Sequence, residues 1–151
     1  MGTGGALRLA LPYLLSDPII VMNGDSFINV DINDYMAWFL KTNCRASILL
    51  TKVSDISRYG RVITDSNGQV VTFEEKGGNG NEGWINAGVY IMQKSLIESI
   101  PPGKYFSLER QFFPKLVKCG LYGFRFNGDF IDIGTPETYA TAEDFFKNRC
   151  I

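Results

Sequence analysis

The sequence predicts an α/β fold in which helices cover a mixed, mostly parallel sheet. Short unbroken apolar runs alternate along the 151-residue chain with stretches whose apolar residues recur at helical spacing. Unbroken apolar runs are typical of strands that are buried on both faces, as in parallel sheets. One hairpin signal, Asn67-Gly68, interrupts the alternation and makes the sheet mixed. Sheets of this kind bind ligands at the carboxyl ends of their strands.

The first third of the chain predicts two helices and two strands. Apolar residues at helical spacing predict a helix over residues 3–15, in which Pro12 kinks the helix or ends its regular part. A buried strand follows at residues 19–22. Asp31 is a suitable N-cap for a helix that runs toward residue 43, and residues 46–53 form the second buried strand.

The middle of the chain adds the hairpin and one long strand. Residues 62–64 and 70–73 are rich in β-branched side chains and flank the Asn-Gly turn. A loop rich in glycine and asparagine spans residues 77–83, and residues 85–92 predict a strand.

The last third predicts three helices and one strand. A short helix covers residues 94–100, and a longer helix covers residues 108–119 after the N-cap Ser107. Residues 121–126 form a strand. The last helix begins at Thr135-Pro136-Glu137, where a cap, a proline and an acid stand in the order of a helix start.

Composition excludes several classes of function. The apolar fraction of 45% and the net charge of −1 are ordinary for a soluble domain and lack the basic surface that nucleic acid or an anionic membrane requires. The absence of histidine excludes histidine acid–base catalysis, histidine-ligated zinc and Ser-His-Asp sites. No apolar run is long enough to span a membrane, and the start lacks a signal-peptide pattern. Three cysteines without Cys-x-x-Cys spacing indicate free thiols and a cytoplasmic location.

Two segments near the N-terminus are candidate ligand-binding elements. Gly4 and Gly5 lie in a glycine-rich turn that can bring main-chain N–H groups close to a nucleotide; the alternative is a flexible terminus before a helix, which is the commoner meaning of so short a motif. Asp25 directly follows the strand at 19–22, where a carboxylate can bind Mg²⁺. An ordinary Asn-Gly turn with a capping Asp explains this position equally well.

Four more polar residues are candidates for the same site. Glu75 and Lys76 follow a strand, where Glu75 can accept hydrogen bonds from a sugar and Lys76 can pair with a phosphate, although a solvated charge cluster is the commoner explanation. Asn86 is the one amide in an apolar strand, so its partner is either a sugar hydroxyl or a backbone carbonyl. Asp132 precedes the last helix and is either a second metal ligand facing Asp25 or an acid that interacts with the helix dipole.

The order of these segments resembles that of the sugar-phosphate nucleotidyltransferases, also known as nucleoside-diphosphate-sugar pyrophosphorylases. Seven motifs follow the order of that family over nearly the whole chain: Gly2-Thr3-Gly4-Gly5-Ala6, Asn23-Gly24-Asp25, Tyr59-Gly60-Arg61-Val62, Glu75-Lys76, Asn86-Ala87-Gly88-Val89-Tyr90, Phe106-Ser107-Leu108-Glu109 and Asp132-Ile133-Gly134-Thr135-Pro136-Glu137. The chain is most similar to the D-glycero-D-manno-heptose-1-phosphate and mannose-1-phosphate guanylyltransferases.

The resemblance implies a Rossmann-like fold of the nucleotide-diphospho-sugar transferase type. It implies a reaction in which a sugar-1-phosphate attacks the α-phosphorus of a nucleoside triphosphate, so that GMP is transferred and pyrophosphate leaves. This chemistry depends on positioning and charge neutralisation, which suits a chain without histidine.

The resemblance also implies roles for individual residues. Asp25, Asp132 and Lys76 correspond to catalytic positions, the two aspartates as ligands of Mg²⁺ and the lysine beside the sugar phosphate. Substrate-binding positions are implied for the remaining candidates, namely Gly4 and Gly5 at the nucleobase and Gly60, Glu75 and Asn86 at the sugar. The implied partners are a nucleoside triphosphate, a sugar-1-phosphate and further copies of the chain, with no nucleic acid and no membrane.

One part of the family pattern has no counterpart in this sequence, namely a first strand that leads into a glycine-rich loop with an arginine and a Pro-Lys pair. Residues 1–151 are therefore expected to be a single nucleotidyltransferase domain, N-terminally truncated, that has little or no activity by itself and self-associates through an exposed sheet edge. Two alternatives stay open. One is a non-catalytic sugar-nucleotide-binding or regulatory subunit. The other is a metal-dependent glycosyltransferase, which is disfavoured because Phe27 occupies the place of the second acid of Asp-x-Asp.

Overall fold

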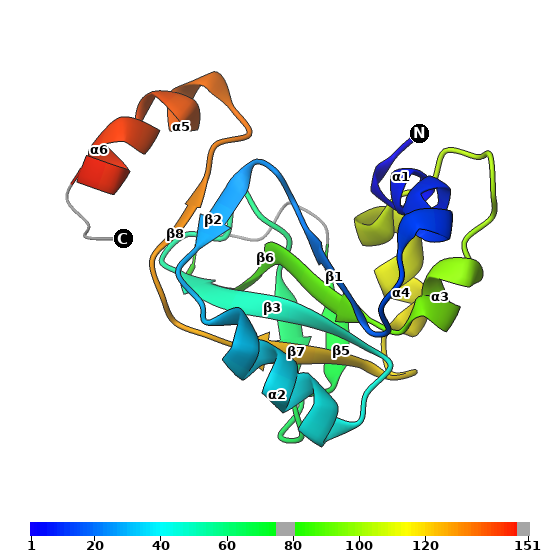
Figure 1. The fold of residues 1–151 in the computed structure, drawn as a ribbon. Coiled ribbons are helices and arrows are strands. Elements are labelled where there is room, and N and C mark those ends of the chain that lie inside the picture. The colour runs from blue at the N-terminus through cyan, green and yellow to red at the C-terminus, as the bar shows by residue number, and fades with distance from the viewer. Residues whose placement is uncertain (75–80, 148–151) are drawn as a thin grey trace.

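The computed structural model describes residues 1–74 and 81–147, and a four-stranded sheet lies at the centre of this part of the chain (Figure 1). Its strands lie in the order β1 (Ile19–Met22), β6 (Gly83–Met92), β3 (Ala46–Val53) and β7 (Leu121–Arg125). β6 is antiparallel to both of its neighbours, whereas β3 and β7 are parallel. β1, β3 and β7 therefore run in one direction and β6 in the other, which confirms the mixed sheet.

The expectation of a mostly parallel sheet holds for the strand directions and not for the hydrogen-bonded pairs. Because β6 lies between β1 and β3, only the pairing of β3 with β7 is parallel within the described sheet. β1 is an outer strand, and its second edge pairs with no strand in residues 1–74 and 81–147.

Apolar side chains cover both faces of the sheet, as the unbroken apolar runs predict. In β3, Ile48 and Leu50 belong to one hydrophobic cluster and Leu49 to the other, because successive side chains of a strand point to opposite faces. α2 (Ile32–Thr42) covers one face and contributes the buried Tyr35. The other face is covered by α1 (Thr3–Ala10), α3 (Lys94–Glu98) and α4 (Phe113–Leu116), which gather on one side of the molecule (Figure 1).

The first two helices begin and end as the sequence predicts. α1 is followed by the 3-10 turn η1 (Leu11–Tyr13), so the regular helix ends just before Pro12. α2 begins after Asp31, whose carboxylate accepts a hydrogen bond of 2.7 Å from the N–H of Asn33. Asn43 follows α2 in the left-handed conformation that ends the helix.

The single helix predicted over residues 108–119 is wrong. A π-helical turn, η2 (Leu108–Phe112), follows the N-cap Ser107 and leads into α4, which ends at Leu116. Pro114 has no N–H, so the hydrogen bonds of one continuous α-helix cannot form across this point. The last helix is likewise divided at Thr141, into α5 (Pro136–Ala140) and α6 (Ala142–Lys147).

Two small ladders complete the fold. β4 (Val62–Thr64) and β5 (Val70–Phe73) form the predicted hairpin, and Gly68 at its turn has a positive φ of 83°. β2 (Ser26–Ile28) pairs antiparallel with β8 (Phe130–Asp132), a ladder that the sequence did not predict.

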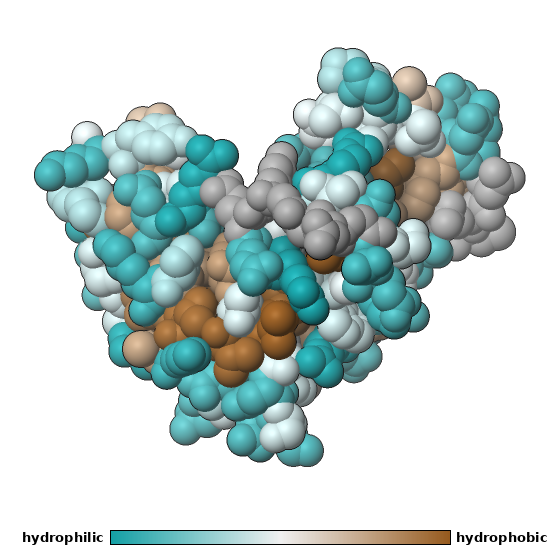
Figure 2. All heavy atoms as spheres, turned by 180° about the vertical axis from the view of Figure 1, so that it is seen from behind, coloured by the Kyte–Doolittle hydropathy of each residue, from teal (hydrophilic) through white to brown (hydrophobic). Residues whose placement is uncertain are grey.

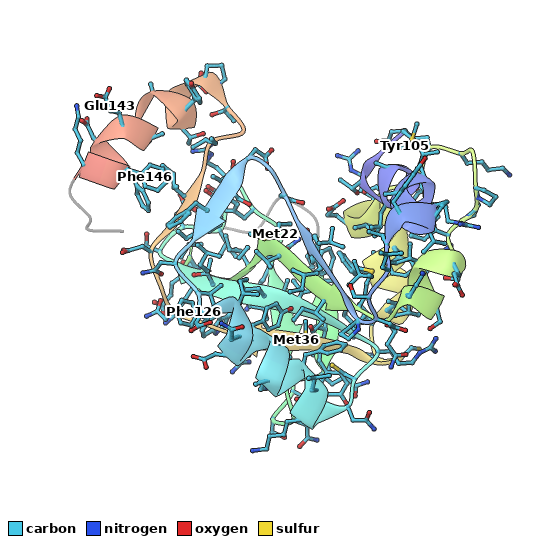
Figure 3. The ribbon with its side chains drawn as sticks, in the orientation of Figure 1. Met22, Met36, Tyr105, Phe126, Glu143 and Phe146 are labelled. Atoms are coloured by element: carbon cyan, nitrogen blue, oxygen red, sulfur yellow. The ribbon has the colours of Figure 1, made fainter. Side chains whose placement is uncertain are left out.

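The arm formed by α5 and α6 extends away from the sheet (Figure 1). Its contact with the body of the molecule is aromatic: the ring centroid of Phe27 lies 6.2 Å from that of Phe145 and 5.1 Å from that of Phe146. Figure 3 shows Phe146 extending from α6 on the side that faces the body. No helix within the described ranges is long and apolar enough to cross a membrane.

Candidate active site

Asp25 lies just past the carboxyl end of β1, where the chain turns toward β2. The N–H of Asn23 donates to the carbonyl of Gly88 at 2.8 Å, and the carbonyl of Asp25 accepts from the N–H of Ile133 at 2.8 Å. This short connection is therefore tied to β6 on one side and to the segment after β8 on the other. The Asp25 carboxylate itself is exposed.

Asp132 is the last residue of β8, and the β2–β8 ladder brings it to Asp25. Its register partner is Ser26, the neighbour of Asp25 in sequence. The carboxylate of Asp132 accepts a hydrogen bond of 2.8 Å from the N–H of Gly134, which fixes the direction of the side chain. Two acids that are far apart in sequence thus lie at the same end of the molecule.

Gly134 shows how close the two carboxylates lie to a common point. A Cβ on Gly134 would stand 3.0 Å from Oδ1 of Asp132 and 3.2 Å from Oδ2 of Asp25. Only a residue without a side chain leaves this space open. The two oxygens therefore face one small volume beside Gly134.

A cavity of about 330 Å³ opens in front of these carboxylates, and we refer to it as the carboxylate hollow. Its lining residues come from the β1–β2 connection, the loop before β4 and the segment after β8: Asp25, Arg58, Tyr59, Asp132, Gly134 and Thr135. Partial burial of Tyr59 raises the pKa of its phenol, the negative charge of Asp132 raises this pKa further, and the positive charge of Arg58 opposes the rise. The charges of Arg58 and Asp132 thus act in opposite directions on the pKa of Tyr59.

A second cavity, of about 630 Å³, lies between α1 and β1, and we refer to it as the α1 hollow. It is lined mostly by small and apolar side chains and by the β1–β2 connection: Thr3, Ala6, Leu7, Ala10, Val21, Met22, Asn23, Gly24, Asp25 and Leu108. Asp25 lines both cavities, so they meet at this carboxylate. From the opposite side, Figure 2 shows the surface notched between the lobe that carries α1 and the arm of α5 and α6.

Gly4 and Gly5 are not among the residues that line the α1 hollow. Both are buried, and a Cβ would stand 2.9 Å from the Phe106 ring at Gly4 and 2.7 Å from the Lys104 carbonyl at Gly5. The N–H of Gly5 also donates to the carbonyl of Phe106 at 3.0 Å. The glycines thus allow α1 to pack directly on the segment before η2, and the flexible terminus considered from the sequence is wrong.

Asn86 belongs to a hydrogen-bonded network that reaches Thr3, one of the residues lining the α1 hollow. Its Nδ2 donates to the hydroxyl of Tyr90 at 2.8 Å, and its Oδ1 accepts from the N–H of Gly88 at 2.9 Å. The alternative prediction, that the Asn86 amide pairs with a backbone carbonyl, is therefore wrong. Tyr90 in turn donates to Glu109 at 3.2 Å, and Thr3 at the start of α1 donates to Glu109 at 2.8 Å.

Sequence reasoning missed Tyr90 and Glu109 as members of this network. Burial and the nearby charge of Glu109 raise the pKa of Tyr90, which stays protonated and donates. Glu109 stands two residues after the N-cap Ser107 and therefore has the pattern of an ordinary first-turn acid. Only its contacts with Tyr90 and Thr3 reveal that it links η2 to β6 and α1.

The remaining predicted residues are placed as follows. Gly60 is half-buried in the loop before β4, next to Tyr59, and does not line the carboxylate hollow. Glu75 and Lys76 lie outside the described residues. Arg58 was not predicted, although it immediately precedes the Tyr59-Gly60 motif.

The carboxylate pair has a donor set that suits Mg²⁺. Among residues 1–74 and 81–147, no group of three or more acids, cysteines or histidines converges, so two carboxylates are the available protein ligands. Mg²⁺ is typically bound by one or two carboxylates and completes its shell with substrate phosphates and water. The open volume beside Gly134 is compatible with such a site.

Comparisons with known proteins agree with this architecture. The chain belongs to the nucleotidyl transferase family, whose model matches residues 1–149. It is 34% identical over 144 residues to D-glycero-alpha-D-manno-heptose 1-phosphate guanylyltransferase of Aneurinibacillus thermoaerophilus. The matched region covers 95% of this chain and 62% of that protein. It is also 32% identical over 142 residues to mannose-1-phosphate guanylyltransferase of Mycobacterium tuberculosis, and this match covers 92% of this chain and 40% of that protein.

A solved structure confirms the type of fold implied by the resemblance. HddC from Yersinia pseudotuberculosis, in a crystal structure with GMP-PN, matches with a TM-score of 0.82 and 37% sequence identity over 95% of this chain and 62% of that chain. The chain thus spans less than two thirds of the length of these relatives.

Proposed function

We propose that this chain takes part in transferring GMP from GTP to a sugar-1-phosphate, with release of pyrophosphate and formation of a GDP-sugar. The observation that carries the proposal is the pair Asp25 and Asp132, whose carboxylate oxygens face one open volume beside Gly134. Relatives that are guanylyltransferases of heptose and mannose 1-phosphates support this substrate class. The proposed domain is residues 1–151.

In this proposal Asp25 and Asp132 hold a divalent cation, Mg²⁺. The cation would neutralise phosphate charge and orient the reacting groups. The protein's contribution is to hold the two carboxylates in place: the β2–β8 ladder aligns their backbones, and the N–H of Gly134 orients Asp132. Such outer contacts of metal ligands contribute substantially to metal affinity.

The two hollows are proposed to hold the two substrates. The α1 hollow, lined mainly by small and apolar groups, suits a nucleoside, with Gly4 and Gly5 allowing α1 to approach. The sugar-1-phosphate is assigned to the other side of Asp25, with Gly60, Glu75 and Asn86 at the sugar and Lys76 at its phosphate. Asn86 is held by Tyr90 and Gly88, so its amide would contact a sugar in a fixed orientation.

Binding measurements test the proposal directly. Mn²⁺ binding followed by electron paramagnetic resonance, and mannose-1-phosphate and GTP binding followed by calorimetry, are compared for the unaltered chain, Asp25→Asn, Asp132→Asn and Asp34→Asn. Asp34 is an exposed acid in the first turn of α2 and serves as the charge-matched control. We expect the first two variants to lose Mn²⁺ binding and the control to keep it.

Formation of a GDP-sugar is measured in the same samples, with mannose-, glucose- and heptose-1-phosphates as acceptors and with UTP and dTTP in place of GTP. Failure of the unaltered chain to bind any sugar-1-phosphate or nucleotide in the presence of Mg²⁺ would contradict the proposed function. Equal Mn²⁺ binding by all four proteins would contradict the assignment of the two aspartates.

A further inference from the structure

Arg58 is the one basic side chain among the described residues that line the carboxylate hollow. It lies in the loop between β3 and β4 and is exposed to solvent. Asp25 and Asp132 line the same hollow. One guanidinium and two carboxylates therefore line a single cavity.

The guanidinium of Arg58 does not neutralise these carboxylates directly. Within residues 1–74 and 81–147 it forms neither an ion pair nor a hydrogen bond, although its charge acts on the nearby side chains of Asp55 and Glu137. The N–H donors of Arg58 therefore have no hydrogen-bond partner within the described residues.

This arrangement has the charge pattern of a site for a metal-bound phosphate. A divalent cation on the two carboxylates would present its remaining coordination positions to phosphoryl oxygens. A guanidinium that lines the same cavity can bind further oxygens of the same group in bidentate geometry. We propose that Arg58 binds the phosphoryl group held at the Asp25–Asp132 site. The inference rests on the proposed function and adds a substrate-binding residue to it.

The phosphoryl oxygens have two possible sources, the sugar-1-phosphate and the nucleotide, and separate titrations distinguish them. Calorimetry with mannose-1-phosphate, GMP and phosphate-free mannose, each with Mg²⁺, is carried out on the unaltered chain, Arg58→Gln, Arg58→Lys and Arg61→Gln. Arg61 is the matched control, because it is an exposed arginine three positions further along that does not line the hollow.

We expect Arg58→Gln to weaken binding of one phosphate ligand about tenfold or more relative to Arg61→Gln, as for loss of a charge-assisted hydrogen bond. The ligand that weakens identifies the source of the phosphate. Arg58→Lys restores part of the loss, because lysine keeps the charge without the planar fork. Binding of phosphate-free mannose should be the same for all four proteins.

Mn²⁺ binding supplies a readout that a damaged fold would not imitate. Removing a positive charge that faces two carboxylates should leave their affinity for Mn²⁺ equal or higher, whereas local unfolding would lower the affinity for metal and phosphate together. Equal phosphate binding by Arg58→Gln and Arg61→Gln, or a parallel loss of Mn²⁺ binding in Arg58→Gln, would overturn the inference while the proposed function stands. If the unaltered chain binds neither phosphate ligand, both the proposed function and this inference are overturned.

Discussion

Ser26 and Asp132 are register partners in the β2–β8 ladder, and this pairing places the carboxylate of Asp132 next to that of Asp25. The ladder is short, with three pairs of residues, and it joins the first part of the chain to the last. The geometry of the candidate metal site therefore depends on a long-range contact outside the main sheet.

Gly134→Ala tests how tightly this geometry is built. The added methyl group would stand 3.0 Å from Asp132 Oδ1 and 3.2 Å from Asp25 Oδ2, so at least one carboxylate has to move. We expect Mn²⁺ affinity to fall about tenfold, as for loss of a supporting contact around a metal ligand. Electron paramagnetic resonance of Mn²⁺ measures the change.

Gly24→Ala is the matched control, since a Cβ at Gly24 would meet no atom within 4 Å although the residue adjoins Asp25. Identical Mn²⁺ affinities for the two glycine variants would mean that the carboxylates do not share the volume beside Gly134.

Gly88→Ala is expected to destabilise the fold. Gly88 has a φ of 79°, and a Cβ there would stand 2.6 Å from Ser26 Oγ and 2.9 Å from Asn23 Nδ2. The left-handed backbone costs a residue with a side chain about 1–2 kcal/mol, and overpacking adds about 1–3 kcal/mol. Urea denaturation should show a loss of about 2–5 kcal/mol in the free energy of unfolding. A free energy of unfolding equal to that of Gly24→Ala would refute this explanation of Gly88.

Phe27→Ala is expected to release α6 from the body of the molecule. The rings of Phe145 and Phe146 pack edge-on against Phe27, and neither α5 nor α6 contains a buried residue, so the Phe27 ring is a main apolar contact of α6 with the body. Amide hydrogen exchange should become faster in α6 and stay unchanged in β3 and β6. Tyr139→Ala, at a side chain 67% exposed on the same arm, serves as the control. Unchanged exchange in α6 after loss of the Phe27 ring would show that other contacts hold the helix.

The contribution of Cys44 to stability is expected to depend on pH, and its thiol is expected to react slowly in the folded protein. Burial raises the pKa of its thiol to about 11, above the ordinary value of about 8.5 that applies to the unfolded chain. The folded state therefore favours the neutral thiol. Its contribution to stability is complete below about pH 8.5 and declines as the pH rises toward 11. Between about pH 8.5 and 11, the free energy of unfolding of Cys44→Ala should therefore fall less than that of the unaltered chain.

Peptide mapping after brief iodoacetamide treatment at pH 8 provides a second measurement on the native chain. The exposed Cys119 should be alkylated, while the buried Cys44 should react only when the chain unfolds. Rapid alkylation of Cys44 in the folded protein would contradict its burial.

Local patterns in the sequence were sufficient for most of the fold. Unbroken apolar runs predicted β1, β3 and β6, and the Asn-Gly turn predicted the β4–β5 hairpin, because strand and turn preferences act over a few neighbouring residues. Asp31 and Thr135 predicted helix starts for the same reason. The order of short motifs along the chain was sufficient for the family, which the match over residues 1–149 confirms.

Contacts between distant segments had to come from the tertiary structure. The ladder that joins Ser26 to Asp132 has three residues on each side, too few for a periodic signal, and depends on strands that meet only after the chain folds. The same holds for Arg58, an ordinary loop arginine in sequence that lines the carboxylate hollow, and for Gly4 and Gly5, whose close neighbours lie near residue 106. The sequence by itself therefore determined the elements, the family and the candidate acids, whereas long-range packing decided which of these residues share one cavity.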